Sequence, residues 1–131
     1  MLSRTDAIVP ATPAADHTGK EGFFVEPSGA AVAVINSAAD LPLGVITEGR
    51  PQTGKDSIAI CGGGAGIVKV KLSANPGAVV FGAYLVLDGA TLGTAKLDPG
   101  AGARVRVARA LEAGAADERI DAILLDPVAL T

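Results

Sequence analysis

The feature that most constrains this fold is an alternation of apolar and charged residues with a period of two. In "IVKVKL", the apolar residues Val68, Val70 and Leu72 alternate with lysines, and in "RVRVAR" Val105 and Val107 alternate with arginines. Successive side chains of a β-strand point to opposite faces, so each stretch predicts a strand with one buried and one solvated face. A helix would need apolar spacings of three and four.

Similar short apolar runs follow one another from Phe23 onward, separated by turn signals such as Asn-Pro-Gly, Asp-Gly and Asp-Pro-Gly. We therefore predict one mainly β domain over residues 23–131, a small compact barrel or sandwich-like fold with little helix. The predicted strands cover residues 23–26, 30–35, 43–47, 57–60, 66–72, 78–81, 84–87, 103–111 and 120–125. The side chains predicted to point inward are Val68, Val70, Leu72, Val105, Val107, Ile120 and Leu124.

Residues 1–22 differ from the rest of the chain. They contain few large apolar residues, two prolines and charges of both signs without periodicity. This composition predicts an extended N-terminal arm that does not belong to the core. Its candidates for contacts with a partner or a neighbouring subunit are Leu2, Ile8, Val9 and Pro10.

The charge balance argues against several classes of partner. The chain has 11 Lys and Arg against 14 Asp and Glu, a net charge of −3, and its basic residues are scattered. Binding to a phosphate backbone needs a concentrated basic surface, so we expect no nucleic-acid partner. No run approaches the ~20 apolar residues of a membrane span, and no secretory signal is evident. We therefore expect no membrane partner and synthesis in the cytoplasm.

The composition also indicates association with other subunits. Hydrophobic residues make up 49% of the chain but aromatic residues only 3%, so the core must be aliphatic. A small domain of this kind often covers its remaining apolar surface by assembling, and we expect a homo-oligomer. The single cysteine, Cys61, excludes an internal disulfide and fits a reducing compartment.

The stretch "GRPQTGKD" has most of a phosphate-binding P-loop, but its context is wrong. A P-loop places its lysine before a Ser or Thr and at the start of a helix. Here Asp56 follows Lys55, and the next residues alternate as a short strand. We interpret the stretch as a hairpin loop and expect no nucleotide cofactor.

Three other candidates for chemistry are weak. Cys61 and His17 would need to lie within hydrogen-bonding distance to act as nucleophile and base, and His17 falls in the predicted arm. The glycines before Ile67 fail as a dinucleotide fingerprint, because an alternating strand follows them. The four acidic residues near the C-terminus lack calcium-site spacing and predict a solvated face: Asp117, Glu118, Asp121 and Asp126. We expect no catalytic residues, no metal and no cofactor, and hence no enzyme.

Several segments, in order, are similar to the capsid cement or head decoration proteins of tailed bacteriophages. The chain resembles that family over about residues 40–126, close to two-thirds of its length. The matching segments are "LGV" at 43–45, a glycine-to-valine step at 77–80, "YLVLDG" at 84–89, and "ALEAG" at 110–114 with "IDAILL" at 120–125. The family pattern does not include the long arm of this chain.

The resemblance implies a virion protein that binds the outer surface of an expanded head and stabilises it. The implied partner is the major capsid protein, the implied assembly is a homotrimer, and the implied location is the outer capsid surface after synthesis in the host cytoplasm. Two alternatives remain open. One is another β-rich virion component, such as a tail or head-fibre subunit, and the other is a small-ligand-binding β module.

Overall fold

The computed structural model describes residues 8–131, which form ten strands in two antiparallel sheets. The first sheet has the order β1-β5-β4-β2-β3 and comes from the N-terminal half of the chain. Its strands are β1 (Ile8–Ala11), β2 (Phe24–Ser28), β3 (Ala31–Val34), β4 (Gly44–Glu48) and β5 (Asp56–Ile60).

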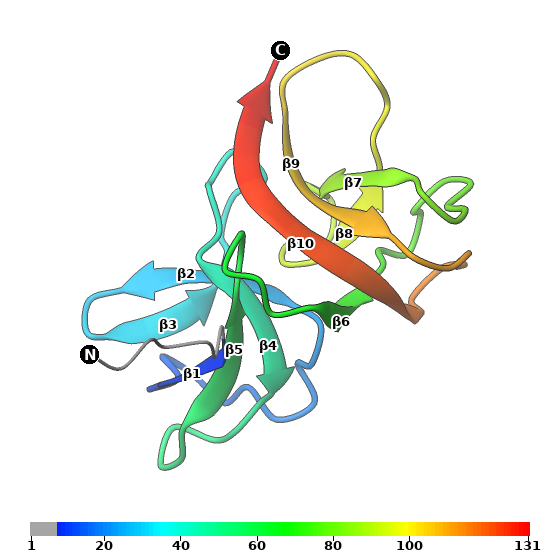
Figure 1. The fold of residues 1–131 in the computed structure, drawn as a ribbon. Helices are drawn as coiled ribbons and strands as arrows, with labels where there is room; N and C mark the ends of the chain where they lie inside the picture. Colours follow the sequence, from blue (N-terminus) through cyan, green and yellow to red (C-terminus); the bar gives the residue numbers. More distant parts are fainter. Residues whose placement is uncertain (1–7) are drawn as a thin grey trace, which may run out of the picture.

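The second sheet has the order β6-β10-β9-β7-β8 and comes from the C-terminal half. Its strands are β6 (Ile67–Lys71), β7 (Tyr84–Leu87), β8 (Ala95–Leu97), β9 (Arg104–Ala110) and β10 (Arg119–Leu130). Figure 1 shows the two sheets packed on each other, with the long, curved β10 crossing the second sheet. The fold is mainly β, as predicted. Of the two predicted forms, barrel and sandwich, the structure has the sandwich-like form and is not a closed barrel.

The main core lies between the sheets. Phe24, Ile35 and Val45 of the first half pack in one cluster with aliphatic side chains from every strand of the second sheet. All seven side chains predicted to point inward are buried there: Val68, Val70, Leu72, Val105, Val107, Ile120 and Leu124. The period of two was therefore a sufficient guide to the faces of β6 and β9.

The first sheet also buries its other face. Val25, Val32, Ile46 and Ile58 form a second apolar cluster, against which Val9 packs. The Val32 N–H donates to Thr12 O and the Ala14 N–H donates to Val32 O, both at a distance of 2.8 Å. The sheet therefore curls around this cluster. These bonds join the segment after β1 to β3, the opposite edge of the sheet.

Residues 8–22 consequently differ from the predicted arm. Ile8–Ala11 is extended, but it pairs in register with β5 and belongs to the first sheet. Further along, His17 is buried, and Gly22 bonds to Ile46 and Lys71, one in each sheet. Gly22 has φ +87°, and a Cβ there would lie 2.7 Å from the Lys71 nitrogen, so this junction needs glycine. The expectation that this stretch stands apart from the core is wrong.

Three other strand predictions differ from the structure. Residues 78–81 are not a strand, because Val79 makes only an isolated bridge to Gly114 before the chain turns. Conversely, β8 was not predicted, and β10 continues to Leu130, past the expected end at residue 125. A register shift after Leu124 carries β10 past Pro127. Within residues 8–131 there is no helix, and so none that would be long and apolar enough to cross a membrane.

Candidate interaction surface

The P-loop-like stretch is a hairpin loop, as predicted. Residues 49–55 join β4 to β5, which pair antiparallel. Asp56, the first residue of β5, is buried and accepts hydrogen bonds from the Arg50 N–H at 2.8 Å and from His17 Nδ1 at 2.5 Å. Lys55 Nζ donates to Thr12 Oγ1 at 2.6 Å. The residues that suggested a phosphate site thus close a loop and fasten it to the N-terminal segment.

Cys61 and His17 do not form a catalytic pair. His17 is held by Asp56 at the start of β5, whereas Cys61 follows the end of the same strand. Five residues of strand at ~3.3 Å each separate the two ends by about 16 Å. Burial, together with the nearby Asp126 carboxylate, raises the pKa of Cys61 to about 12. The thiol therefore stays protonated and is a poor nucleophile.

The acidic residues near the C-terminus are dispersed along the surface. Asp121 lies opposite Lys69 and accepts from its Nζ at 2.8 Å, which lowers the pKa of Asp121 and raises that of Lys69. Asp126 lies against the Gly62 turn, and Asp117 occupies a turn with φ +62°. In the described part of the chain, no three His, Cys, Asp or Glu residues are grouped as metal ligands would be.

The most distinctive surface is a row of side chains across the outer face of the second sheet. Ile67 on β6 pairs with Ile123 on β10, Ile123 pairs with Arg109 on β9, and Arg109 pairs with Tyr84 on β7. Directly paired residues project to the same side of a sheet. We call these four residues, Ile67, Ile123, Arg109 and Tyr84, the outer row. All of them are exposed, with 65% of Ile67 and 42% of Ile123 accessible to solvent.

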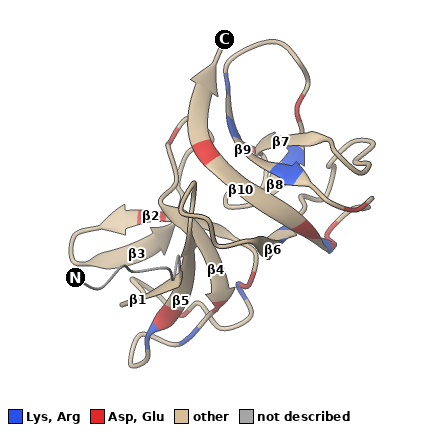
Figure 2. Cartoon of the chain, in the orientation of Figure 1, with Lys and Arg blue, Asp and Glu red and all other residues tan. Residues whose placement is uncertain are grey.

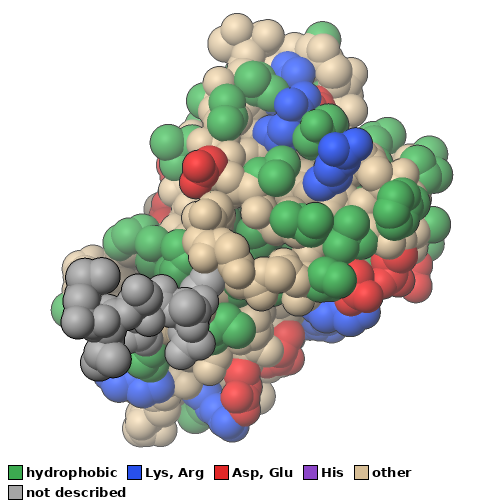
Figure 3. All heavy atoms as spheres, in the orientation of Figure 1, with side chains coloured by type: hydrophobic (Ala, Val, Ile, Leu, Met, Phe, Trp, Pro, Cys, Tyr) green, Lys and Arg blue, Asp and Glu red, His purple; other side chains and the backbone are tan. Residues whose placement is uncertain are grey.

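Apolar surface extends beyond the outer row. Leu125 and Val128 follow Ile123 along β10, and Val80 and Phe81 lie in the turn that precedes β7, where Phe81 is 73% exposed. Figure 3 shows apolar side chains spread over the second sheet with basic side chains among them.

Charged pairs border this apolar region on two sides. Lys69 contacts Asp121 and Glu112 at one border. At the other, Asp98 accepts from Arg104 and Arg106. Figure 2 shows charged positions on β9 and β10 at these borders. An apolar centre with a polar rim is the usual anatomy of a protein–protein interface.

Two arginines stack on the aromatic ring of the outer row. The guanidinium carbon of Arg106 lies 4.2 Å from the centroid of the Tyr84 ring, and that of Arg109 lies 4.8 Å from it. At exposed sites such contacts contribute roughly 0.5–1 kcal/mol each, so they favour this arrangement of the ring and the two guanidinium groups.

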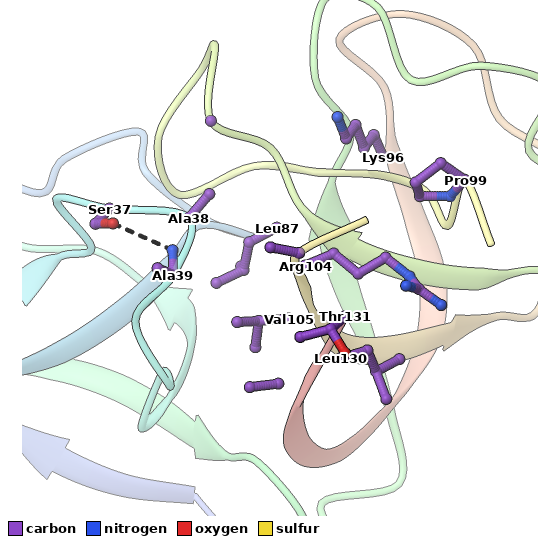
Figure 4. Close-up of a pocket in the computed structure, with 13 residues that line it drawn as sticks. Ser37, Ala38, Ala39, Leu87, Lys96, Pro99, Arg104, Val105, Leu130 and Thr131 are labelled. Carbon is purple, nitrogen blue, oxygen red and sulfur yellow. Dashed lines mark hydrogen bonds between the residues drawn. The ribbon is translucent and has the colours of Figure 1, made fainter. Parts of the chain in front are cut away.

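A second feature is a cleft of about 490 Å³ at one end of the sandwich, lined by the loop between β3 and β4, by the second sheet and by the C-terminal residues (Figure 4). Leu87, Val105 and Leu130 supply apolar walls. Its charged lining residues already have partners, since Arg104 pairs with Asp98 and Lys96 lies 4.0 Å from Asp88. The cleft is large enough for a small ligand, and its two charged lining residues are already engaged within the chain.

The contact residues predicted from the sequence differ in their exposure to solvent. Ile8 is 43% exposed and Pro10 is exposed, so both are accessible on β1, whereas Val9 packs against the inner cluster of the first sheet. Leu2 lies outside the described residues. A role for Ile8 and Pro10 in partner contacts stays a prediction. The outer row was not anticipated as a contact surface, although Ile67 and Ile123 fall on the charged side of their alternating strands.

No protein-family model matches this sequence, and a comparison with curated proteins found no match.

Proposed function

We propose that this protein is a capsid decoration, or cement, protein of a tailed bacteriophage. It binds the major capsid protein on the outer surface of the expanded head, as a homo-oligomer for which we favour a trimer, and it stabilises the shell. The observation that carries the proposal is the outer row, an exposed apolar surface with a charged rim on a rigid sheet. The order of segments shared with decoration proteins supports it.

The surface suits binding to a repeating lattice. A sheet face held by paired strands needs little ordering when it docks, so little conformational entropy is lost. Burying apolar side chains such as Ile67 and Ile123 contributes roughly 25 cal/mol per Å² removed from water. When one oligomer makes several such contacts at once, each copy can bind weakly and the assembly is still retained.

The two alternatives differ from this proposal in their sites. A tail or head-fibre subunit would use the same kind of exposed surface on another part of the virion. The cleft beside Leu87 and Leu130 is the observation that favours a small-ligand module. Gene position separates these alternatives cheaply, because a decoration protein is expected beside the genes for the capsid protease and the major capsid protein.

The direct test is co-sedimentation of the purified protein with undecorated heads of the phage that encodes it. We expect saturable binding to expanded heads and none to unexpanded proheads. Ile123→Glu should weaken binding, because it places a charge in the apolar centre of the surface. The matched control is Leu41→Glu, which changes an exposed leucine in the loop between β3 and β4. Equal binding by both variants, or none by the wild type, would refute the proposal.

A further inference from the structure

Arg109 differs from Arg104, Arg106 and Lys69 because, within residues 8–131, it has no carboxylate partner. Arg104 and Arg106 pair with Asp98, and Lys69 pairs with Asp121. Within residues 8–131, Arg109 makes no ion pair, and its single hydrogen bond runs from Nε to Gly82 O at 3.0 Å. The side chain is exposed, and its other N–H groups have no hydrogen-bond partner within residues 8–131.

The side chain is nevertheless held in place. The bond to Gly82 fixes one edge of the guanidinium, and the Tyr84 ring supports it at 4.8 Å. Gly82 is itself tied to β9, because its N–H donates to Ala110 O at 2.7 Å. Arg109 is therefore a positioned cation, and binding a partner group would cost it little further ordering.

The neighbours of Arg109 are apolar. Ile123 and Tyr84 pair with it on the flanking strands, and the turn that carries Val80 and Phe81 is joined to it through Gly82. A partner that buries these side chains also strips water from the guanidinium. An entirely apolar partner would leave this charge without compensation, which is costly, whereas a carboxylate would restore its hydrogen bonds.

We propose that Arg109 recognises an aspartate or glutamate that the major capsid protein presents among apolar side chains. This inference rests on the proposed function and assigns the chemistry of its contact surface. The guanidinium donates N–H groups other than Nε–H to the carboxylate, in the geometry for which arginine is better suited than lysine. The apolar residues of the outer row surround the pair and exclude water. Arg109 thus sets which site on the shell is bound.

The test measures binding to expanded heads for the wild type and for Arg109→Glu, Arg109→Ala and Arg109→Lys. Arg109→Glu should bind at least roughly 30-fold more weakly, because two carboxylates would face each other in a desolvated contact. Arg109→Ala should also bind weakly. Arg109→Lys should recover part of the affinity, since it keeps the charge but not the planar fork. Urea unfolding of each variant verifies that it is folded.

The matched control is Arg50→Glu, which makes the same change in charge at an exposed arginine in the hairpin loop of the first sheet. It should bind within about threefold of the wild type, as expected for a charge far from the contact. Wild-type binding with an unchanged affinity for Arg109→Glu would overturn the inference while leaving the proposed function intact. Failure of the wild type to bind would overturn the proposed function and this assignment with it.

Sedimentation of the same variants without heads tests a second copy of the chain as the occupant. If Arg109→Glu dissociates the oligomer, the carboxylate that Arg109 binds belongs to a neighbouring subunit. Its assignment to the capsid protein is then wrong. An unchanged oligomer combined with weaker head binding supports the assignment.

Discussion

At the scale of single residues, the buried Asp56 has the clearest structural role. Its carboxylate accepts a hydrogen bond from the Arg50 backbone N–H in the hairpin loop and a second from His17 Nδ1. It therefore links β5 to the segment that precedes β2. Removing it would leave the Arg50 N–H and a buried imidazole without their partner. The residue that spoils the P-loop motif is therefore an anchor of the fold.

We predict that Asp56→Ala lowers the free energy of unfolding by about 3 kcal/mol, the usual cost of leaving one member of a buried polar pair uncompensated. Urea unfolding followed by circular dichroism measures the change. Lys55→Ala, an exposed neighbour in the same loop, is the control and should have little effect. Similar unfolding midpoints for the two variants would contradict the anchoring role of Asp56.

Asp98 provides a test through pH. Its side chain is 7% exposed, and although burial acts to raise the pKa of this carboxyl, the Gly100 N–H and the guanidinium groups of Arg106 and Arg104 lower it below its ordinary value. A lowered folded-state pKa contributes stability above the unfolded value of about 3.9, and this is lost as pH falls through the folded pKa.

Asp98→Asn should therefore be less stable than the wild type at pH 7, and the two should converge as the pH is lowered below about 4. Urea unfolding at a series of pH values measures the gap. A gap that stays constant down to pH 2 would show that Asp98 contributes by packing and not through its charge.

At the scale of elements, β1 shows where reasoning from composition failed. Residues 8–11 read "IVPA", which is too short to display a period, and its proline suggested an arm. The strand forms because β5 offers an edge and Val9 fills the inner cluster, both of which depend on distant residues. Pro10 is tolerated because β1 is an edge strand.

We predict that replacing residues 8–17 by Gly and Ser, with the chain length kept, destabilises the protein by several kcal/mol. The replacement removes the pairing of β1 with β5 and the His17 contact with Asp56. The midpoint of urea unfolding measures the loss, and Gly/Ser replacement of the exposed loop residues 51–53 is the control. An unchanged midpoint would show that residues 8–17 do not stabilise the domain and form a separate arm after all.

The other elements show what local sequence can specify. The sequence predicts both the position of β6 and β9 and which of their side chains are buried. Each strand is long enough to show alternation and has one solvated side. The segment 78–81 has the composition of a strand, yet it lies in a turn because Gly77 and Gly82 both adopt positive φ. β8 has only three residues and is fixed by its pairing with β7, so no local pattern could reveal it.

At the scale of the whole molecule, the sandwich-like class followed from the alternation and the turns, but the outer row did not. Its members lie far apart in the sequence and meet only through the register of four strands. One sequence feature points to this surface: Ile67 and Ile123 stand on the charged sides of their strands, where exposure to solvent would favour polar residues. Only the strand order brings them beside Arg109 and Tyr84.

The most direct test of this account is an electron cryo-microscopy map of expanded heads mixed with the purified protein. We predict density for the protein on the outer surface of the shell, with the outer row facing the capsid protein and Ile123 and Arg109 covered. The first sheet should face away from that contact. Heads that remain bare, or bound protein whose outer row points into solvent, would contradict the account.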